Sequence, residues 1–340
     1  MNVGRIARIS TVLIFLMLVA GLSVTAAGNE SLSPNLALTA ISATASAPVA
    51  PADNWRLWVK SLNLDRNDGA ATIMLDDPGP SGQEILGTSD LDLGERAGRE
   101  IGTAFKTPER EYEIRFYDLP AWSASTGTMT SDAGFAIQFV EPIGDTSAPF
   151  EFDANSRSKL KGAELNARWP TKGGTVKFFA GIGKASLEDT LSIAGTVQEN
   201  GDSYDMAFDI AARNDLWGGQ VGMGAPLFTL GKLTANWYGK YGFYRNSVST
   251  RVDTDEEDGP SYSVRAGGHK FCSMRDIGFD LTYALKPDQT ISVGLHDLAL
   301  YGVATAARQI PVSDPVGGTA EFGTGRVAYR GTWATYTFRW

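Results

Sequence analysis

The chain contains two histidines, His269 and His296, and imidazole is the side chain best suited to proton transfer near neutral pH. An imidazole acts as a general base when a carboxylate orients it. His296 follows the KPDQ turn at 286–289 by about seven residues, and this turn is expected to bring it close to Asp280 on the preceding strand. The pair suggests a surface hydrolase. However, no further carboxylates are placed to hold a water molecule above His296, so we expect a hydrogen-bonded histidine without a catalytic role.

Three other stretches could carry chemistry. The segment VDTDEEDGP at 252–260 is rich in carboxylates, which can bind calcium, but it lacks the full calcium loop of about twelve residues. We interpret it as a solvated acidic connection and leave divalent-ion binding open. Cys272 is the only cysteine, which excludes an internal disulfide and a cysteine-rich zinc site. No helix is expected after GGQVGMG at 218–224, so a phosphate cradle is not predicted.

The composition limits the class of protein that positions these residues. Hydrophobic residues make up 43% and charged residues 20% of the chain, which argues against disorder and against a helical membrane protein. The 38 glycines and an aromatic content of 10% favour a β-protein with tight turns. The formal net charge of −9 argues against a nucleic-acid partner, because binding to phosphates needs basic stripes.

The amino terminus has the pattern of a targeting segment. Arg5 and Arg8 precede the apolar run TVLIFLMLVAGL at 11–22, and small residues follow in SVTAAG. This run is too short to span a bilayer as a helix, so a cleaved signal peptide over 1–26 is predicted in preference to an uncleaved anchor. Residues 27–53 are rich in Ala, Ser, Thr and Pro and are expected to form a flexible leader. The mature chain is therefore expected to be exported.

Beyond residue 54, hydrophobic residues alternate with a period of two, which indicates β-strands. In KLTANWYGKYGFYR at 232–245, Leu233, Trp237 and Phe243 lie on one face, while Asn236 and Lys240 lie on the other. The same alternation recurs at 112–117, 162–169, 175–182 and 277–286. Each strand is therefore expected to have one apolar and one polar face.

The connections between these segments alternate between short turns and long polar stretches. The short turns are at 106–110, 170–174, 230–232 and 286–289, and the long stretches lie near 64–97, 121–158, 186–213, 247–270 and 304–325. An outer-membrane barrel requires this alternation, with tight periplasmic turns and long external loops. The predicted hairpin pairs are 99–106 with 110–118, 160–169 with 175–184, 215–229 with 233–246, and 271–285 with 290–302.

A first strand at 55–64 and a last strand at 328–340 complete the predicted architecture. The fold class is all-β: a transmembrane antiparallel up-and-down β-barrel of about ten strands over 54–340, with long extracellular loops. Eight or twelve strands stay open, because the segment at 137–143 and the stretch near 208 could also be strands. The lipid of the outer membrane is the expected surrounding of the apolar faces.

The last strand is strongly aromatic: Tyr336, Phe338 and Trp340 share one face. Amphipathic rings are favoured at a membrane interface. This pattern resembles the carboxyl-terminal signal of bacterial outer-membrane β-barrels, and the resemblance implies that the barrel-assembly machinery reads these three residues. The segments WRLWVKSL and LDLGERAGREIGTAF are also similar to the first two strands of uncharacterised barrel proteins from planctomycete-type bacteria. That likeness implies the fold and no activity.

The polar faces of such a barrel would line its lumen and carry charges of both signs. Burying an unpaired charge is costly, so these charges are expected to pair and to fill the narrow interior. A barrel of about ten strands is only slightly wider than the eight-stranded kind that side chains fill. The predicted lumen charges are Glu113, Arg115, Glu164, Arg168, Lys177, Lys240, Asp280 and His296, and Glu100 and Glu111 are expected to point inward as well.

These features together predict a structural or surface-interaction protein in the outer membrane of a Gram-negative-type bacterium, with a lumen plugged by side chains. Its external loops would meet a ligand that the sequence does not identify. The alternatives are a narrow channel for ions or small solutes, a surface hydrolase, and a secreted soluble β-protein. No catalytic residue, metal ion or cofactor is predicted.

Overall fold

The computed structural model describes residues within the unit Asp53–Trp340. The described residues are 54–67, 73–76, 84–87, 90–91, 93–131, 135–137, 143–146, 149–171, 175–199, 201–257 and 261–340. The predicted signal peptide over 1–26 and leader over 27–53 lie outside this set. A helix with the length and hydropathy needed to cross a bilayer does not occur among the described residues.

Long strands form the wall of a barrel, and short elements lie in the connections. The wall strands are β1 (Trp55–Asn67), β4 (Glu95–Lys106), β5 (Glu111–Ser125), β9 (Phe150–Pro170), β10 (Lys177–Glu199), β11 (Asp202–Leu230), β12 (Leu233–Glu256), β13 (Tyr262–Lys286), β14 (Gln289–Val303) and β17 (Gly325–Arg339). The short elements are β2 (Ile73–Asp76), β3 (Glu84–Gly87), β6 (Met129–Ser131), β7 (Phe135–Ile137), β8 (Ile143–Thr146), the 3₁₀ helix η1 (Ala307–Val312), β15 (Ser313–Asp314) and β16 (Thr319–Ala320).

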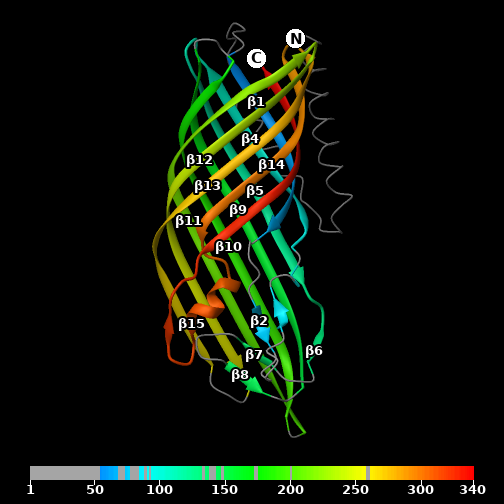
Figure 1. Cartoon of the computed structure of the whole chain (residues 1–340), viewed down its shortest axis with the longest axis vertical. Helices are drawn as coiled ribbons and strands as arrows, with labels where there is room; N and C mark the ends of the chain where they lie inside the picture. Colours follow the sequence, from blue (N-terminus) through cyan, green and yellow to red (C-terminus); the bar gives the residue numbers. More distant parts are fainter. Residues whose placement is uncertain are drawn as a thin grey trace, which may run out of the picture. The chain divides into compact units, whose positions relative to one another are not determined.

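The wall is closed and antiparallel throughout. Its strands pair in the order β10-β11-β12-β13-β14-β17-β1-β4-β5-β9, and β9 pairs with β10 to complete the ring (Figure 1). The first and last strands meet, with Arg56 opposite Arg339. The sheet has eleven strands, of which β6 pairs only with β9, so ten strands form the wall. The predicted antiparallel barrel of about ten strands is confirmed.

The four predicted hairpins are present, but two predicted long connections are wrong. The stretches at 186–213 and 247–270 are almost entirely strand, because β10 runs to Glu199 and β12 runs to Glu256. The outward residues of these two strand segments are polar, so the amino-acid composition of the segments is similar to that of loops. The stretch near 208 lies within β11, whereas β7, which ends at the start of the 137–143 segment, belongs to a separate sheet with β2, β3 and β8.

The apolar face of the wall changes sides along the strands. In β12, Tyr241 and Phe243 are exposed on the outside, whereas beyond Arg245 the outward residues are polar and the inward Val248 and Val252 are buried. We call the half with the short turns the belt half and the other the far half. The exposed apolar side chains of the belt half form the apolar belt: Leu57, Ile101, Ile114, Phe116, Leu165, Ile182, Val221, Tyr241, Phe243, Phe279, Leu281, Tyr283, Val293 and Leu295.

Nothing in the described part of the chain covers the apolar belt. Phe279 and Leu281, in the half of β13 that leads to the short turn, are 50% and 46% exposed, so they do not pack against a second sheet or a helix. Aromatic side chains gather on the outside beside the short turns, where Trp55, Trp169 and Trp340 are all exposed. Such a ring of aromatic residues is typical of a membrane interface.

The interior of the far half is a continuous apolar core. Its largest members include Trp122 and Tyr329, whose rings lie 5.0 Å apart, and Leu64, Leu119 and Leu187, all of which are at most 1% exposed. Because these side chains come from β1, β5, β10 and β17, they meet across the lumen. The far half therefore resembles a water-soluble barrel, which is apolar inside and polar outside.

The connection between β14 and β17 folds into this core at the end of the barrel away from the short turns (Figure 1). The Asn214 side chain accepts a hydrogen bond from the Ala304 amide at 2.8 Å and donates one to the Ala304 carbonyl at 2.7 Å. Asp189 accepts a bond from the Ala306 amide at 2.8 Å and pairs with Arg66 at 2.7 Å. These buried polar side chains satisfy backbone groups that apolar surroundings would otherwise leave unpaired.

Cys272 lies in the far half, where it is 4% exposed and burial raises the pKa of its thiol to about 12. The reactive thiolate is therefore almost absent at pH 8. We expect a maleimide to label the native protein more than about 100-fold more slowly than the urea-unfolded protein, as followed by intact-mass spectrometry. The variant Cys272→Ser/Ser249→Cys, with its thiol on the outside of β12, should be labelled rapidly in both states. Equal labelling of native and unfolded wild type would contradict this placement.

Candidate functional site in the barrel interior

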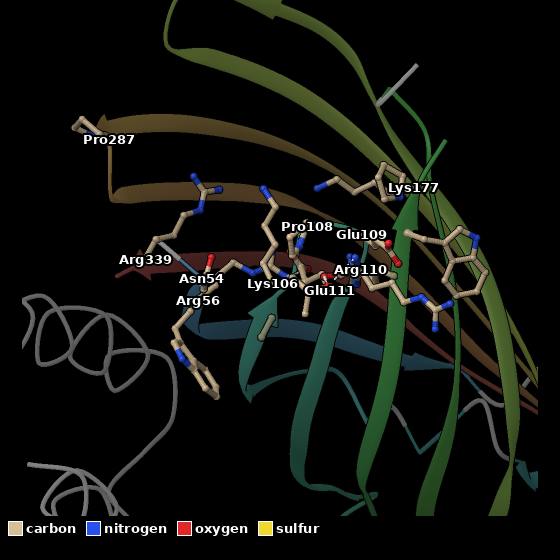
Figure 2. A pocket seen from close by; sticks show the side chains of 16 residues that line it. Asn54, Arg56, Lys106, Pro108, Glu109, Arg110, Glu111, Lys177, Pro287 and Arg339 are labelled. Carbon is tan, nitrogen blue, oxygen red and sulfur yellow. Dashed lines mark hydrogen bonds and ion pairs between the residues drawn. The ribbon is translucent and has the colours of Figure 1, made fainter. Parts of the chain in front are cut away.

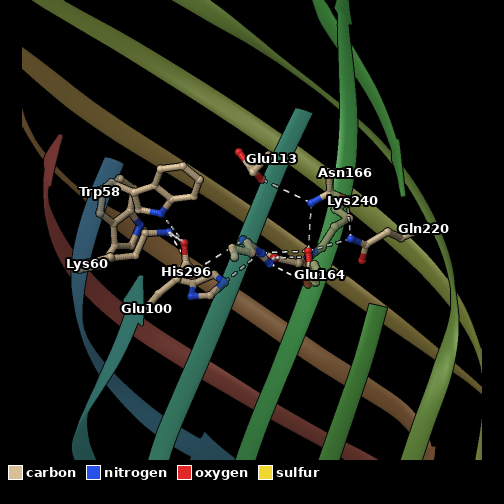
Figure 3. Close-up of polar contacts among 12 residues, drawn as sticks. Trp58, Lys60, Glu100, Glu113, Glu164, Asn166, Gln220, Lys240 and His296 are labelled. Atoms are coloured by element: carbon tan, nitrogen blue, oxygen red, sulfur yellow. Dashed lines mark hydrogen bonds and ion pairs between the residues drawn. The ribbon is translucent and has the colours of Figure 1, made fainter. Parts of the chain in front are cut away.

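The belt half encloses a network of charged side chains that spans the lumen (Figure 3). Seven of the ten wall strands each contribute one inward side chain, because residues of the same parity on neighbouring strands point into the same space. The network comprises Lys60 from β1, Glu100 from β4, Arg115 from β5, Glu164 from β9, Lys240 from β12, Asp276 from β13 and His296 from β14.

Arg115 lies at the centre of the network. Its Nε and Nη2 atoms donate to the two Glu164 oxygens at 2.8 and 2.9 Å, which is the bidentate geometry of a strong charge-assisted pair. Its Nη2 also lies 3.0 Å from Asp276 Oδ2, and its Nη1 lies 3.6 Å from Glu100 Oε2. One guanidinium therefore ties β5 to β4, β9 and β13 across the interior.

Lys240 supports the same two carboxylates, with its Nζ at 2.6 Å from Glu164 and 3.0 Å from Asp276. Gln220 donates a further bond of 2.7 Å to Glu164. The cluster holds three basic side chains, Lys60, Arg115 and Lys240, and three carboxylates, Glu100, Glu164 and Asp276, so its formal charges balance before His296 is counted. Balanced pairing is what permits this many charges to be buried.

His296 contacts a different carboxylate from the predicted one. Its Nε2 lies 2.8 Å from Asp276 Oδ1, whereas Asp280 accepts a bond from Asn236 at 2.7 Å. The residue directly opposite His296 is Gly278, so both aspartates lie two positions away. Alternation alone cannot distinguish them. Gly278 leaves room for the Tyr238 ring, since an added Cβ would lie 2.3 Å from it.

A second layer of ion pairs lies nearer the short turns. Arg168 contacts Glu113 at 2.8 Å, and Arg56 contacts Glu111 at 2.6 Å and Glu113 at 3.3 Å. This layer again balances two cations against two carboxylates. Lys177, also a predicted lumen charge, is exposed at the mouth and lines a cavity there (Figure 2).

The sequence prediction missed three members of the central network that its own alternation pattern could have found. Asp276 has the same parity as Asp280 but precedes the segment from which the strand was read. Lys60 has the inward parity of β1, and Gln220 that of β11. The structure brings together Arg115, Glu164, Lys240 and His296, places Glu113 and Arg168 in the second layer, and separates Asp280 and Lys177 from the centre.

The predicted assembly-signal residues lie on the outer face of β17. Tyr336 and Phe338 face outward beside β14 and β1, and the ring of Phe338 stacks on Trp340 at 5.7 Å. The backbone amide and carbonyl of Trp340 bond to those of Trp55, both at 3.1 Å. These aromatic residues therefore lie along the seam where the last strand meets the first.

The network fixes charged side chains inside the lumen. Its histidine, His296, is 8% exposed, and the apolar core of the far half lies on the side of it away from the short turns. A group of three or more side chains able to hold a metal ion does not occur among the described residues.

In the predicted acidic stretch at 252–260, Asp253 contacts Arg251 and accepts a bond from Ser263 at 2.7 Å, while 258–260 lie outside the described residues. Both carboxylate oxygens of Asp253 therefore have partners within the protein.

No protein-family model and no curated protein sequence matches the chain. Among solved structures, the outer membrane protease OmpT from Escherichia coli is 10% identical, with a TM-score of 0.46 over 85% of this chain and 97% of that one. The translocator domain of the autotransporter NalP from Neisseria meningitidis is 8% identical, with a TM-score of 0.39 over 84% and 88%. The Pseudomonas putida toluene transporter TodX is 8% identical, with a TM-score of 0.29 over 85% and 90%. These similarities concern the fold alone.

Proposed function

We propose that this protein is an outer-membrane β-barrel of a Gram-negative-type bacterium that acts as a structural or surface-interaction protein. The apolar belt anchors it in lipid, and the far half stands outside the membrane and presents its connections to external ligands. The lumen is sealed by side chains, and the protein catalyses no reaction. The barrel-assembly machinery recognises the strand that ends with Tyr336, Phe338 and Trp340.

The apolar belt supports the membrane location. A soluble protein rarely exposes a contiguous apolar surface of more than a few hundred Å², yet the belt has members on nine of the ten wall strands, every one except β17. Polar outward residues begin on several strands just beyond it, for example Arg99 on β4, Lys184 on β10 and Arg275 on β13. A band that is apolar over a limited height and polar beyond it suits a bilayer.

The single observation that carries the sealed-lumen proposal is the sequence of closed layers along the axis. Arg115 bridges the lumen in the belt half, and the core around Leu64, Leu187 and Trp122 follows directly beyond it. An ion that enters from the turn end meets buried, paired charges and then an apolar barrier. Both oppose its passage.

A planar bilayer measurement tests this proposal. Protein reconstituted from detergent is expected to give no discrete conductance steps at ±100 mV in 1 M KCl, while a porin added to the same bilayer shows that the assay detects open barrels. The refolded state is verified beforehand by heat-modifiable migration on a gel. Reproducible steps from the wild-type protein would favour the narrow-channel alternative and contradict the sealed lumen.

A further inference from the structure

The belt half opens at its turn end into a cavity of about 520 Å³ (Figure 2). Its walls come from the start of β1, the turn between β4 and β5, the ends of β9 and β17, and the start of β10. The volume exceeds the ~30 Å³ share of a single water molecule many times over, so the cavity has room for a small organic ligand.

Cations dominate the lining of this cavity. It contains two carboxylates, Glu109 and Glu111, and a third, Glu113, pairs with Arg56 and Arg168. Against the six basic residues of the lining this gives a formal excess of three positive charges (6 − 3) in a chain whose net charge is −9. The basic residues are Arg56, Lys106, Arg110, Arg168, Lys177 and Arg339. Such a concentration of one sign in a concave surface attracts ligands of the opposite charge.

Four of these six cations, Arg110 among them, form no ion pair with a carboxylate of the described residues. Among the described residues, no ion pair joins Lys106, Lys177 or Arg339 to a carboxylate. Figure 2 shows the nitrogen ends of these three side chains extending into the same space. The guanidinium groups of Arg56 and Arg168 lie over the rings of Trp58 and Phe179 and pair with Glu111 and Glu113, so they form the fixed floor of this basic surface.

We propose that this cavity, which we call the basic vestibule, is a binding site for a multivalent phosphate ligand. Guanidinium groups match phosphate oxygens in bidentate geometry, and lysine adds flexible point charges. A ligand with several negative charges would neutralise the excess of three. The proposal does not depend on the sealed lumen, because the vestibule opens at the turn end and lies before the ion-pair network.

Titration of the refolded, detergent-solubilised protein with sodium tripolyphosphate tests the site by isothermal calorimetry. We expect saturable binding with one ligand per chain in 100 mM salt. The variant Lys106→Ala/Lys177→Ala should weaken it at least tenfold, and its fold should be unaffected because both side chains are exposed. The control Lys232→Gln removes a cation from another short turn at the same end, outside the vestibule, and should leave the affinity within twofold of wild type.

Two results would overturn the proposal: no saturable binding by the wild type, or equal weakening in Lys232→Gln and the double variant. Phosphate could come from a soluble ligand or from a lipid headgroup of the facing leaflet. Mixed micelles with phosphatidylglycerol distinguish these sources, with phosphatidylcholine as the reference. Competition by the anionic lipid alone supports the site with a headgroup as occupant, and absence of competition supports the site with a soluble phosphate.

Discussion

Replacing Glu164 with glutamine is expected to lower the free energy of unfolding of the barrel by about 3–5 kcal/mol. The substitution keeps the shape of the side chain and removes the charge that pairs with Arg115 and Lys240. Both cations would stay buried with one carboxylate fewer, and the network would carry a net positive charge. Equilibrium unfolding in urea, followed by tryptophan fluorescence in lipid vesicles, measures the change.

The matched control is Asp297→Asn, which breaks two ion pairs near the outer surface. Asp297 contacts Arg275 at 2.8 Å and Arg330 at 2.9 Å, with side chains between 30% and 59% exposed. Exposed pairs of this kind contribute about 1 kcal/mol or less. If Glu164→Gln cost no more than Asp297→Asn, the central network would not be the buried, closed cluster described above.

The second large effect is expected on the outside of the wall. Leu281→Arg places a charge at the centre of the apolar belt on β13 and should lower the stability in lipid vesicles by about 2–4 kcal/mol, because a guanidinium at the bilayer midplane loses its hydration. His269→Arg, on the same face of the same strand but beyond the belt and opposite Ser247, should cost about 0–1 kcal/mol. Urea titration of both variants in identical vesicles makes the comparison.

A soluble β-protein predicts the opposite pattern for this pair. If lipid did not cover Leu281, arginine there would remain in water, and both variants would be nearly neutral. Equal stabilities would therefore remove the basis for the membrane location, whichever value they share.

Most of the wall could be predicted from the sequence, because a strand with one face in lipid and one in the lumen alternates over its whole length. The hairpin at 160–169 with 175–184 was read directly from this pattern, and its register is Leu165 opposite Ile182. Closure between the first and last strands followed from the rule that a membrane barrel has no free edge.

The far half could not be predicted so well, because the alternation changes phase there. Leu187 and Ile193 point inward on β10, whereas Phe178 and Ile182 point outward on the same strand. A prediction that requires apolar residues on one fixed face therefore ends the strand where the alternation changes phase. The choice between Asp276 and Asp280 failed for a different reason: it depends on strand twist and on the shape of neighbours such as Tyr238, which one-dimensional spacing does not contain.

The reversal of polarity along the wall also restricts how the protein can reach its final position. The far half is polar outside, and Arg213, Arg245 and Lys161 on that surface would each have to pass through hydrocarbon if a finished cylinder slid across from the periplasm. Charged groups make such a crossing prohibitively slow. In the proposed orientation, the strands would therefore have to be threaded outward before the ring closes at β1 and β17, and closure would then block withdrawal.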